Sequence, residues 1–167
     1  MNITTERLFI RKFTFDDWQS VHEYTSDANV MKYIPEGVFS EDDSKKFVYE
    51  NSNEDAKYFP VLLKQDQTLI GHIVFHQYFG DHTYEIGWVF NPKYYGKGYA
   101  TEAAYSILKY GFETMNLHRI IATCQPENIP SYRVMEKIGM RREGFFLKLN
   151  SIIFLLLCLL WLFGILV

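Results

Sequence analysis

The stretch "YEIGWVFNPKYYGKGYATEAA", residues 84–104, joins an apolar run to a helical segment through a turn with two glycines. Pro92 lacks an amide hydrogen and cannot continue a strand ladder. Gly96 and Gly98 have no Cβ, so a ligand can approach the backbone closely. Successive N–H groups from Gly96 to Ala100 would point outward at the positive end of the helix dipole. That arrangement favours an anion, above all a phosphate.

The charge near this turn supports the same interpretation, because Lys97 adds a cation beside the two glycines. A hydrogen bond to a charged group contributes about 1.5–3 kcal/mol, so three or four of them would hold a pyrophosphate firmly. The stretch matches neither the P-loop nor the GxGxxG pattern. Taken alone, it is equally compatible with a plain strand-to-helix turn that uses glycine only for its geometry.

The segments around this turn predict one mixed sheet. Apolar runs at 58–64, 69–78 and 84–90 are separated by short turns and indicate an antiparallel meander. Helical spacing over 100–115 leads to a further strand at 119–125. A strand, a helix and a strand in this order form a βαβ unit, so 84–90 and 119–125 should be parallel neighbours.

The remaining elements are marked by local signals. An N-terminal strand is expected over 7–13, followed by helices that begin after Thr14 and Ser40, each with an aspartate three residues on. A last helix over 129–140 ends at Gly139. The chain is thus predicted to be an α/β (α+β) domain with a mostly antiparallel sheet flanked by helices.

Composition narrows the class of protein. The chain has 167 residues, of which 48% are hydrophobic and 22% charged, which fits one folded domain. Its net charge of −3 argues against a general nucleic-acid binder. The two cysteines, Cys124 and Cys158, show no metal spacing and no disulfide pattern. With no signal-peptide segment at the start, a cytoplasmic location is expected.

Three motifs in this order resemble the GNAT (Gcn5-related) N-acetyltransferases, and most of all the branch of ribosomal-protein N-terminal acetyltransferases. They are "TERLFIRKFTFDDW", "YEIGWVFNPKYYGKGYATEA" and "NIPSYRVMEKIGM", and the resemblance covers residues 4–144. The family signature, Gln or Arg, two residues, Gly, one residue, then Gly or Ala, falls on Tyr95, Gly98 and Ala100. Tyr95 departs from it. The resemblance implies a GNAT-like fold in which the parallel fourth and fifth strands splay apart.

The resemblance also implies acetyl-CoA as co-substrate, with its pyrophosphate on the glycine turn and its pantetheine arm between the splayed strands. The implied cofactor-binding residues are Val89, Phe90, Tyr95, Gly96, Lys97, Gly98, Tyr99, Ala100, Asn128 and Ser131. Asn128 resembles the family asparagine that binds the arm, and it is equally suited to cap the helix that follows.

The same resemblance assigns catalytic roles. Glu85 is the candidate general base, and a backbone N–H near Val89 or Phe90 is the candidate oxyanion donor. Many family members carry a tyrosine that acts as general acid where this chain has Met135, which cannot donate a proton. Ser131, one helical turn earlier, is the candidate acid, although a first-turn helix residue without chemistry is as good an interpretation. No metal site is expected, since His72 and His76 lack further ligands at suitable spacing.

The segment after Asn150, "SIIFLLLCLLWLFGILV", does not follow the family pattern. Three interpretations stay open: a membrane anchor at the short end of the required 17–25 residues, buried strands of the sheet, or a shifted reading frame near Leu147. The third is preferred, so residues 1–146 are taken as the acetyltransferase domain and 147–167 as an atypical apolar tail. A membrane contact through the tail is not favoured, and an oligomer is compatible with the sequence.

The sequence therefore predicts an enzyme that moves acetyl from acetyl-CoA to a primary amine, either a protein N-terminus or a small molecule. The alternative from another class is a non-catalytic acyl-CoA-binding or regulatory module that keeps the phosphate site and lacks turnover.

Overall fold

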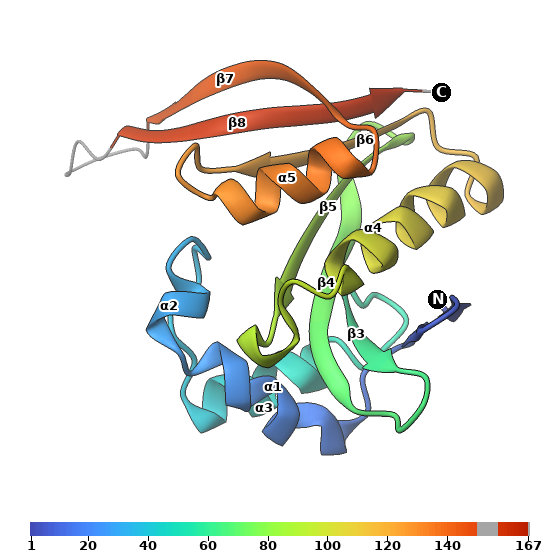
Figure 1. Ribbon diagram of the computed structural model, residues 1–167, viewed down its shortest axis with the longest axis vertical. Helices are drawn as coiled ribbons and strands as arrows, with labels where there is room; N and C mark the ends of the chain where they lie inside the picture. The colour runs from blue at the N-terminus through green and yellow to red at the C-terminus, as the bar shows by residue number, and fades with distance from the viewer. Residues whose placement is uncertain (150–156, 167) are drawn as a thin grey trace.

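The computed structural model describes residues 1–149 and 157–166, whose eight strands form one sheet in the order β1-β2-β3-β4-β5-β6-β8-β7 (Figure 1). The β5–β6 pair is parallel and every other neighbouring pair is antiparallel. The strands are β1 (Ile3–Thr4), β2 (Leu8–Ile10), β3 (Tyr58–Leu63), β4 (Leu69–Phe79), β5 (Thr83–Phe90), β6 (Arg119–Cys124), β7 (Arg141–Leu149) and β8 (Leu157–Leu166).

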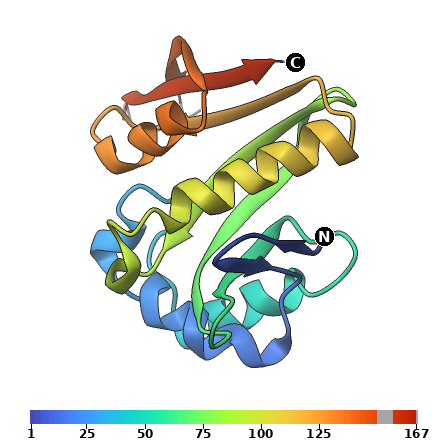
Figure 2. The same cartoon turned by 45° about the vertical axis from the view of Figure 1, so that its right-hand side comes forward.

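The helices cover both faces of this sheet (Figure 2). Helices α4 and α5 pack on one face, where Ala103, Ile107 and Met135 join the larger core cluster. Helices α1 and α3 pack on the other face, where Val21 and Val48 join a second cluster. The helices are η1 (Phe15–Asp17), α1 (Trp18–Thr25), α2 (Ala28–Met31), α3 (Glu41–Glu50), η2 (Pro92–Tyr94), α4 (Tyr99–Lys109), η3 (Tyr110–Thr114) and α5 (Ile129–Lys137).

The local signals in the sequence act as expected. Thr14 with Asp17, and Ser40 with Asp43, form the two capping boxes at the starts of η1 and α3. Gly139 takes a left-handed conformation just beyond α5, with φ of +87°. The expected strand over 7–13 is shorter than predicted, because Arg11 and Lys12 leave the ladder and the Arg11 guanidinium turns to pair with Asp17.

The parallel pair has the feature that the resemblance implied. Thr83, Tyr84 and Glu85 pair with Arg119, Ile120 and Ile121, and the pairing ends there although both strands continue. Beyond Glu85 the two strands diverge (Figure 1). The predicted fold class is confirmed: a mixed, mostly antiparallel sheet with one parallel pair and helices on both faces.

The apolar C-terminal segment is a strand in the structure over Leu157–Leu166. This strand, β8, lies between β6 and β7 and pairs antiparallel with both of them. Phe163 is fully buried in the larger core cluster. Of the three interpretations of the tail, the structure follows buried strands for these residues, while 150–156 and 167 lie outside the described part of the chain. The domain boundary at 146/147 stays a prediction, and β7 runs across it.

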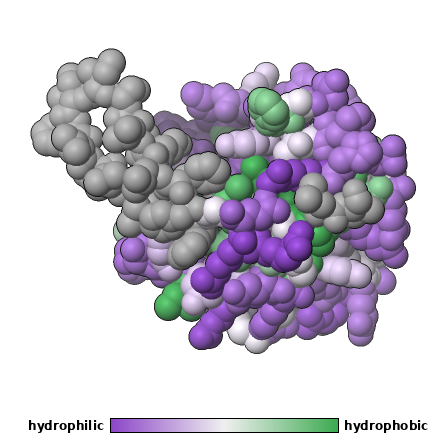
Figure 3. Space-filling model, turned by 90° about the horizontal axis from the view of Figure 1, so that it is seen from above, coloured by the Kyte–Doolittle hydropathy of each residue, from purple (hydrophilic) through white to green (hydrophobic). Residues whose placement is uncertain are grey.

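The surface seen from above is mainly hydrophilic where it is coloured, with hydrophobic side chains showing only between polar ones (Figure 3). Within the described residues, no helix combines the length and the apolar character that crossing a membrane requires.

Candidate functional site

The glycine turn between η2 and α4 has the backbone that a phosphate site requires. Gly96 and Gly98 both adopt left-handed conformations, with φ of +74° and +81°, which side chains with a Cβ rarely take. Gly98 is the N-cap residue of α4 and has no side chain to occupy the first N–H groups of the helix. The N-terminus of α4 is therefore left without a capping side chain, and its donors are available to an anion.

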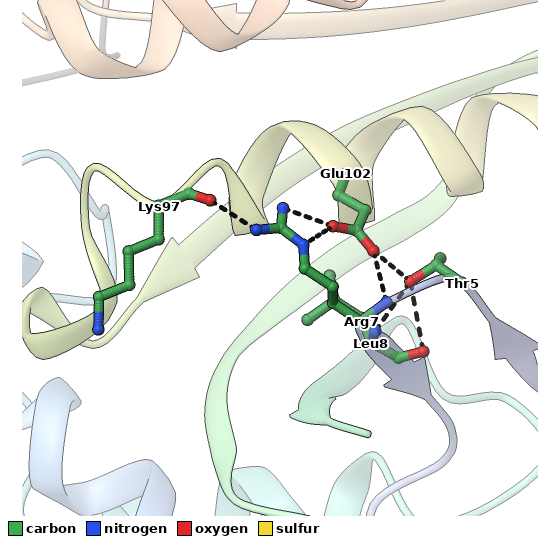
Figure 4. A network of polar contacts seen from close by, with 5 residues as sticks. All are labelled: Thr5, Arg7, Leu8, Lys97 and Glu102. Atoms are coloured by element: carbon green, nitrogen blue, oxygen red, sulfur yellow. Dashed lines mark hydrogen bonds and ion pairs between the residues drawn. The ribbon is translucent and has the colours of Figure 1, made fainter. Parts of the chain in front are cut away.

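A side chain from the other end of the chain holds this turn in place (Figure 4). The Arg7 guanidinium donates from Nη1 to the Lys97 carbonyl oxygen at 3.0 Å. It also pairs with Glu102 in the first turns of α4, with Nε and Nη2 each 2.6 Å from Oε2. The same guanidinium lies 4.7 Å from the centroid of the Tyr99 ring. Arg7 thus contacts both the glycine turn and the start of α4, and its hydrogen bond fixes the direction of the Lys97 carbonyl.

Glu102 is fully engaged by the N-terminal segment. Its carboxylate accepts from the Thr5 hydroxyl at 2.6 Å and from the Arg7 backbone N–H at 3.0 Å, in addition to the guanidinium. Burial raises the pKa of Glu102, but the hydrogen bonds from Thr5 and Arg7 and the Arg7 charge outweigh it, so the pKa lies below its ordinary value. A carboxylate so close to an anion site would repel the ligand, and the guanidinium offsets that repulsion.

An open cavity of about 430 Å³ adjoins the turn. Its walls are Arg7, one side of α4 from Gly98 to Tyr105, and Lys137 and Ile138 at the end of α5. The cavity therefore extends the anion site between the two helices and carries a second cation at its far wall.

Glu85 lies where the parallel strands separate. It is the last residue of β5 that pairs with β6, and its side chain is 20% exposed. The Thr123 hydroxyl on β6 donates to Glu85 Oε1 at 2.9 Å, and His76 Nε2 on β4 lies 3.8 Å from Glu85 Oε2. By strand alternation these side chains share the face that α1 and α3 cover further along. Glu85 is therefore a carboxylate that a hydrogen bond fixes in place and that is partly accessible to solvent.

Tyr58 on β3 lies on this face as well. Its hydroxyl is 3.5 Å from Glu36 Oε1 in the loop after α2. Burial, then the charge of Glu36 and its hydrogen bond, and then the charge of Glu85 raise the pKa of Tyr58 to about 12. The Tyr58 hydroxyl therefore contacts the Glu36 carboxylate and also lies within the electrostatic influence of Glu85.

The other predicted site residues fall in different environments. Val89 and Phe90 are buried at the end of β5. Asn128 caps α5, since its Oδ1 accepts from the Ser131 N–H at 3.4 Å. The capping role is confirmed, and the role of Asn128 in holding pantetheine stays a prediction, as does the acid role of Ser131. Met135 is buried in the core at 2% exposure.

The residues of the signature turn are accessible. Tyr95 is more than half exposed. Two effects raise the pKa of its hydroxyl: first the partial burial of the side chain, and second the negative charge of Asp27. Its hydroxyl remains a donor at neutral pH. Lys97 Nζ lies 5.5 Å from the centroid of the Tyr94 ring, and Ala100 is half-buried in the first turn of α4.

Sequence reasoning missed Arg7, Glu102 and Thr123 as parts of the site. Arg7 lies just before β2 and Thr123 lies on β6, both far from the turn in the sequence, and neither carries a local signal of its own. Within the described part of the chain, no group of three or more His, Cys, Asp or Glu side chains is arranged to hold a metal ion.

Comparison with known proteins identifies the class of this protein. Residues 7–141 match the acetyltransferase (GNAT) domain. The chain therefore belongs to the GNAT acetyltransferase family, which confirms the predicted family and the predicted enzyme class.

Individual relatives agree with this assignment. The chain is 72% identical over 148 residues to YnaD, an N-acetyltransferase of Bacillus subtilis (strain 168), with 89% of this chain and 87% of YnaD covered. A crystal structure of a GNAT-family acetyltransferase from Bacillus anthracis superposes with a TM-score of 0.92 at 64% identity, covering 99% and 98% of the two chains. A spermidine N-acetyltransferase from Vibrio cholerae, in complex with CoA and spermine, shares the fold, with a TM-score of 0.80 at 24% identity over 97% and 96%.

Proposed function

We propose that the protein transfers an acetyl group from acetyl-CoA to a primary amine by direct attack, with Glu85 as general base. The observation that carries this proposal is the presence of two features on β5 and on the turn that follows it. An uncapped helix N-terminus with two left-handed glycines follows the strand, and a held carboxylate lies where the strand leaves its parallel neighbour. The first feature suits a pyrophosphate and the second suits an amine that must lose a proton.

The donor would bind along the edge that the diverging strands leave open. Its pyrophosphate accepts N–H donors from Gly96 to Ala100, and its nucleotide end enters the cavity toward Lys137. The amides of the pantetheine arm pair with backbone groups of β5 beyond Glu85, which have no partner on β6 in the sheet. Asn128 and Ser131 flank the arm from the start of α5.

The reaction then needs little beyond positioning. The acceptor ammonium gives a proton to Glu85, and the neutral amine attacks the thioester carbonyl carbon. The resulting oxyanion accepts from a backbone N–H near Val89 or Phe90. The C–S bond breaks and CoA leaves as its thiolate, while the nitrogen of the adduct gives up its second proton to that thiolate, so the products are the neutral amide and CoA thiol. Because the thiolate can leave before it is protonated, buried Met135 in place of a tyrosine is tolerable, and Ser131 stays the candidate donor.

The acceptor is an amine that carries positive charge when free. The Vibrio cholerae relative was crystallised with spermine, and the carboxylates of Glu36 and Glu85, which both act on Tyr58, suit a cationic acceptor here. A cytoplasmic location, where acetyl-CoA is made and used, belongs to the same proposal.

The test is amine-dependent thiol release from acetyl-CoA, measured over a panel of polyamines, amino acids and short peptides, with the acetylated product identified by mass spectrometry. The wild-type chain should release one thiol for each amine acetylated. Glu85→Gln keeps an oxygen for the Thr123 hydroxyl and should lower turnover by about 10²–10⁴-fold, with acetyl-CoA affinity nearly unchanged. Binding of acetyl-CoA without amine-dependent release would instead show an acyl-CoA-binding module.

A further inference from the structure

In the part of the chain that the structure describes, Glu85 has side-chain partners on both strands next to β5. Thr123 lies two residues beyond Ile121, the last residue of β6 that pairs with β5, so its hydroxyl bridges the point where the strands begin to separate. His76 is the direct cross-strand neighbour of Glu85 in the β4–β5 ladder. One partner holds Oε1 and the other faces Oε2, so the two carboxylate oxygens have different surroundings.

The orientation of the His76 ring follows from its other contact. Nδ1 lies 2.8 Å from the Gln77 carbonyl oxygen, which only accepts hydrogen bonds. Nδ1 therefore carries the hydrogen, and in the neutral ring Nε2 presents a lone pair toward Glu85 Oε2. Two acceptors face each other across 3.8 Å, an arrangement that is favourable once a proton arrives between them.

We propose that Thr123 and His76 complete the base at Glu85, with Thr123 fixing the carboxylate and His76 receiving the proton that the carboxylate removes from the acceptor ammonium. This inference rests on the proposed function. Before the step the acceptor is R–NH₃⁺, Glu85 is a carboxylate and His76 is neutral. After it the acceptor is R–NH₂, Glu85 is again a carboxylate and His76 is an imidazolium. The proton moves from nitrogen to Oε2 to Nε2, and the total charge is unchanged.

The chemistry favours this direction. An imidazole in water binds a proton more tightly than a carboxylate by about two pKa units, and the adjacent carboxylate stabilises the imidazolium. The hydroxyl of Thr123 occupies Oε1, which leaves Oε2 for the acceptor. The tendency to remove a proton from the acceptor therefore depends on the basicity of the His76 imidazole and not only on the weaker basicity of the Glu85 carboxylate.

Other titratable groups near Glu85 do not account for a change of activity near neutral pH. Tyr58 from β3 stays protonated, because burial and then the charges of Glu36 and Glu85 raise its pKa to about 12. On β6, Thr123 does not titrate, and the neighbouring Cys124 belongs to the core of the opposite face. Glu36 contacts Tyr58 rather than Glu85. His72, on the same face of β4, stays neutral near pH 7 because burial lowers its pKa to about 3. The proposal therefore rests on the contact between His76 Nε2 and Glu85 Oε2.

Four variants test this: Thr123→Val, Thr123→Ser, His76→Gln and, as a matched control, His82→Gln in the exposed turn between β4 and β5. For each, kcat and kcat/KM are measured from pH 5.5 to 9.5 with the amine that the wild type acetylates fastest. Acetyl-CoA affinity is measured by calorimetry, and folding by circular dichroism.

Thr123→Val should lower kcat by about tenfold or more without changing acetyl-CoA affinity, and Thr123→Ser should restore most of it. His76→Gln should lower kcat/KM at neutral pH by about 10²-fold, with the loss shrinking at high pH where the acceptor arrives neutral. His82→Gln should retain the wild-type profile. A wild-type profile in His76→Gln, or Thr123→Ser no better than Thr123→Val, overturns this inference alone. Absence of amine-dependent turnover in the wild type overturns the proposed function as well.

Discussion

Arg7, the residue before β2, forms an ion pair with Glu102 in α4, 95 residues further along the chain, and the same guanidinium binds the Lys97 carbonyl oxygen. The N-terminal segment is therefore bonded directly to the glycine turn and to the start of α4. The pair keeps the turn in shape and offsets the negative charge that Glu102 would present to a phosphate.

Arg7→Ala should weaken acetyl-CoA binding by about tenfold, because it frees the turn and leaves the Glu102 carboxylate uncompensated. The double variant Arg7→Ala with Glu102→Gln should recover part of that loss, since the repulsive charge is gone. Calorimetric titration of the three proteins with acetyl-CoA decides it. If the double variant binds more weakly than Arg7→Ala, the electrostatic explanation of the pair is wrong.

Gly98→Val should weaken acetyl-CoA binding at least tenfold, about 1.4 kcal/mol. A side chain at this φ of +81° is strained, and its Cβ would lie 3.5 Å from the Arg7 guanidinium. Gly80→Val is the matched control, because Gly80 is also left-handed, with open space around it, in the turn between β4 and β5. Equal affinity losses in both variants would mean that backbone strain, and not the loss of phosphate binding at the Gly96–Ala100 turn, is responsible.

Part of this site was predictable from the sequence because its signals are local. The glycine turn, the capping boxes and the βαβ order each depend on residues close together in the chain. The Arg7–Glu102 pair and the Thr123–Glu85 hydrogen bond join segments 95 and 38 residues apart. They arise from the packing of α4 on the sheet and from strand register, which a single sequence does not specify residue by residue.

There is a physical reason why the sequence alone did not favour a strand at the position of β8. A strand with one wet face alternates polar and apolar residues, and this segment does not alternate. Its backbone nonetheless has β6 on one side and β7 on the other. An interior strand leaves no open edge of the sheet, and Phe163 on β8 is fully buried in the larger core cluster, so an apolar run is compatible with this position.

Phe163→Ala tests whether β8 belongs to the folded domain. Phe163 is fully buried and packs in the larger core cluster, so its truncation should lower the free energy of unfolding by about 3–5 kcal/mol. Val38→Ala, at a half-exposed site, should change it by less than about 0.5 kcal/mol. Denaturant unfolding of both variants gives the answer. A Phe163 variant as stable as the wild type would show that the strand contributes nothing to the fold.

His72 should make stability depend on pH. It is buried against Tyr24, whose hydroxyl is 2.7 Å from His72 Nδ1, and burial lowers the pKa of His72 to about 3. The unfolded chain binds a proton there near pH 6.5 and the folded chain does not. Stability is therefore full above pH 6.5 and is lost as pH falls toward 3, by at most about 1.4 kcal/mol per pH unit from this group.

Thermal unfolding between pH 7.5 and 4 measures this dependence. His72→Gln should start from a lower midpoint and fall less steeply than the wild type, whereas His82→Gln, at an exposed site, should follow the wild-type slope. An unchanged slope in His72→Gln would show that the acid sensitivity arises from other groups.

The pyrophosphate cradle is tested most directly by comparing two donors in the wild-type chain by calorimetry: acetyl-CoA, and S-acetylpantetheine, which carries the same thioester and arm without the pyrophosphate and nucleotide. If the Gly96–Ala100 turn holds the phosphates, acetyl-CoA should bind at one site per chain and at least about 10²-fold more tightly, since two or more charged hydrogen bonds of about 1.5–3 kcal/mol each are at stake. Equal affinities for the two donors would contradict the cradle.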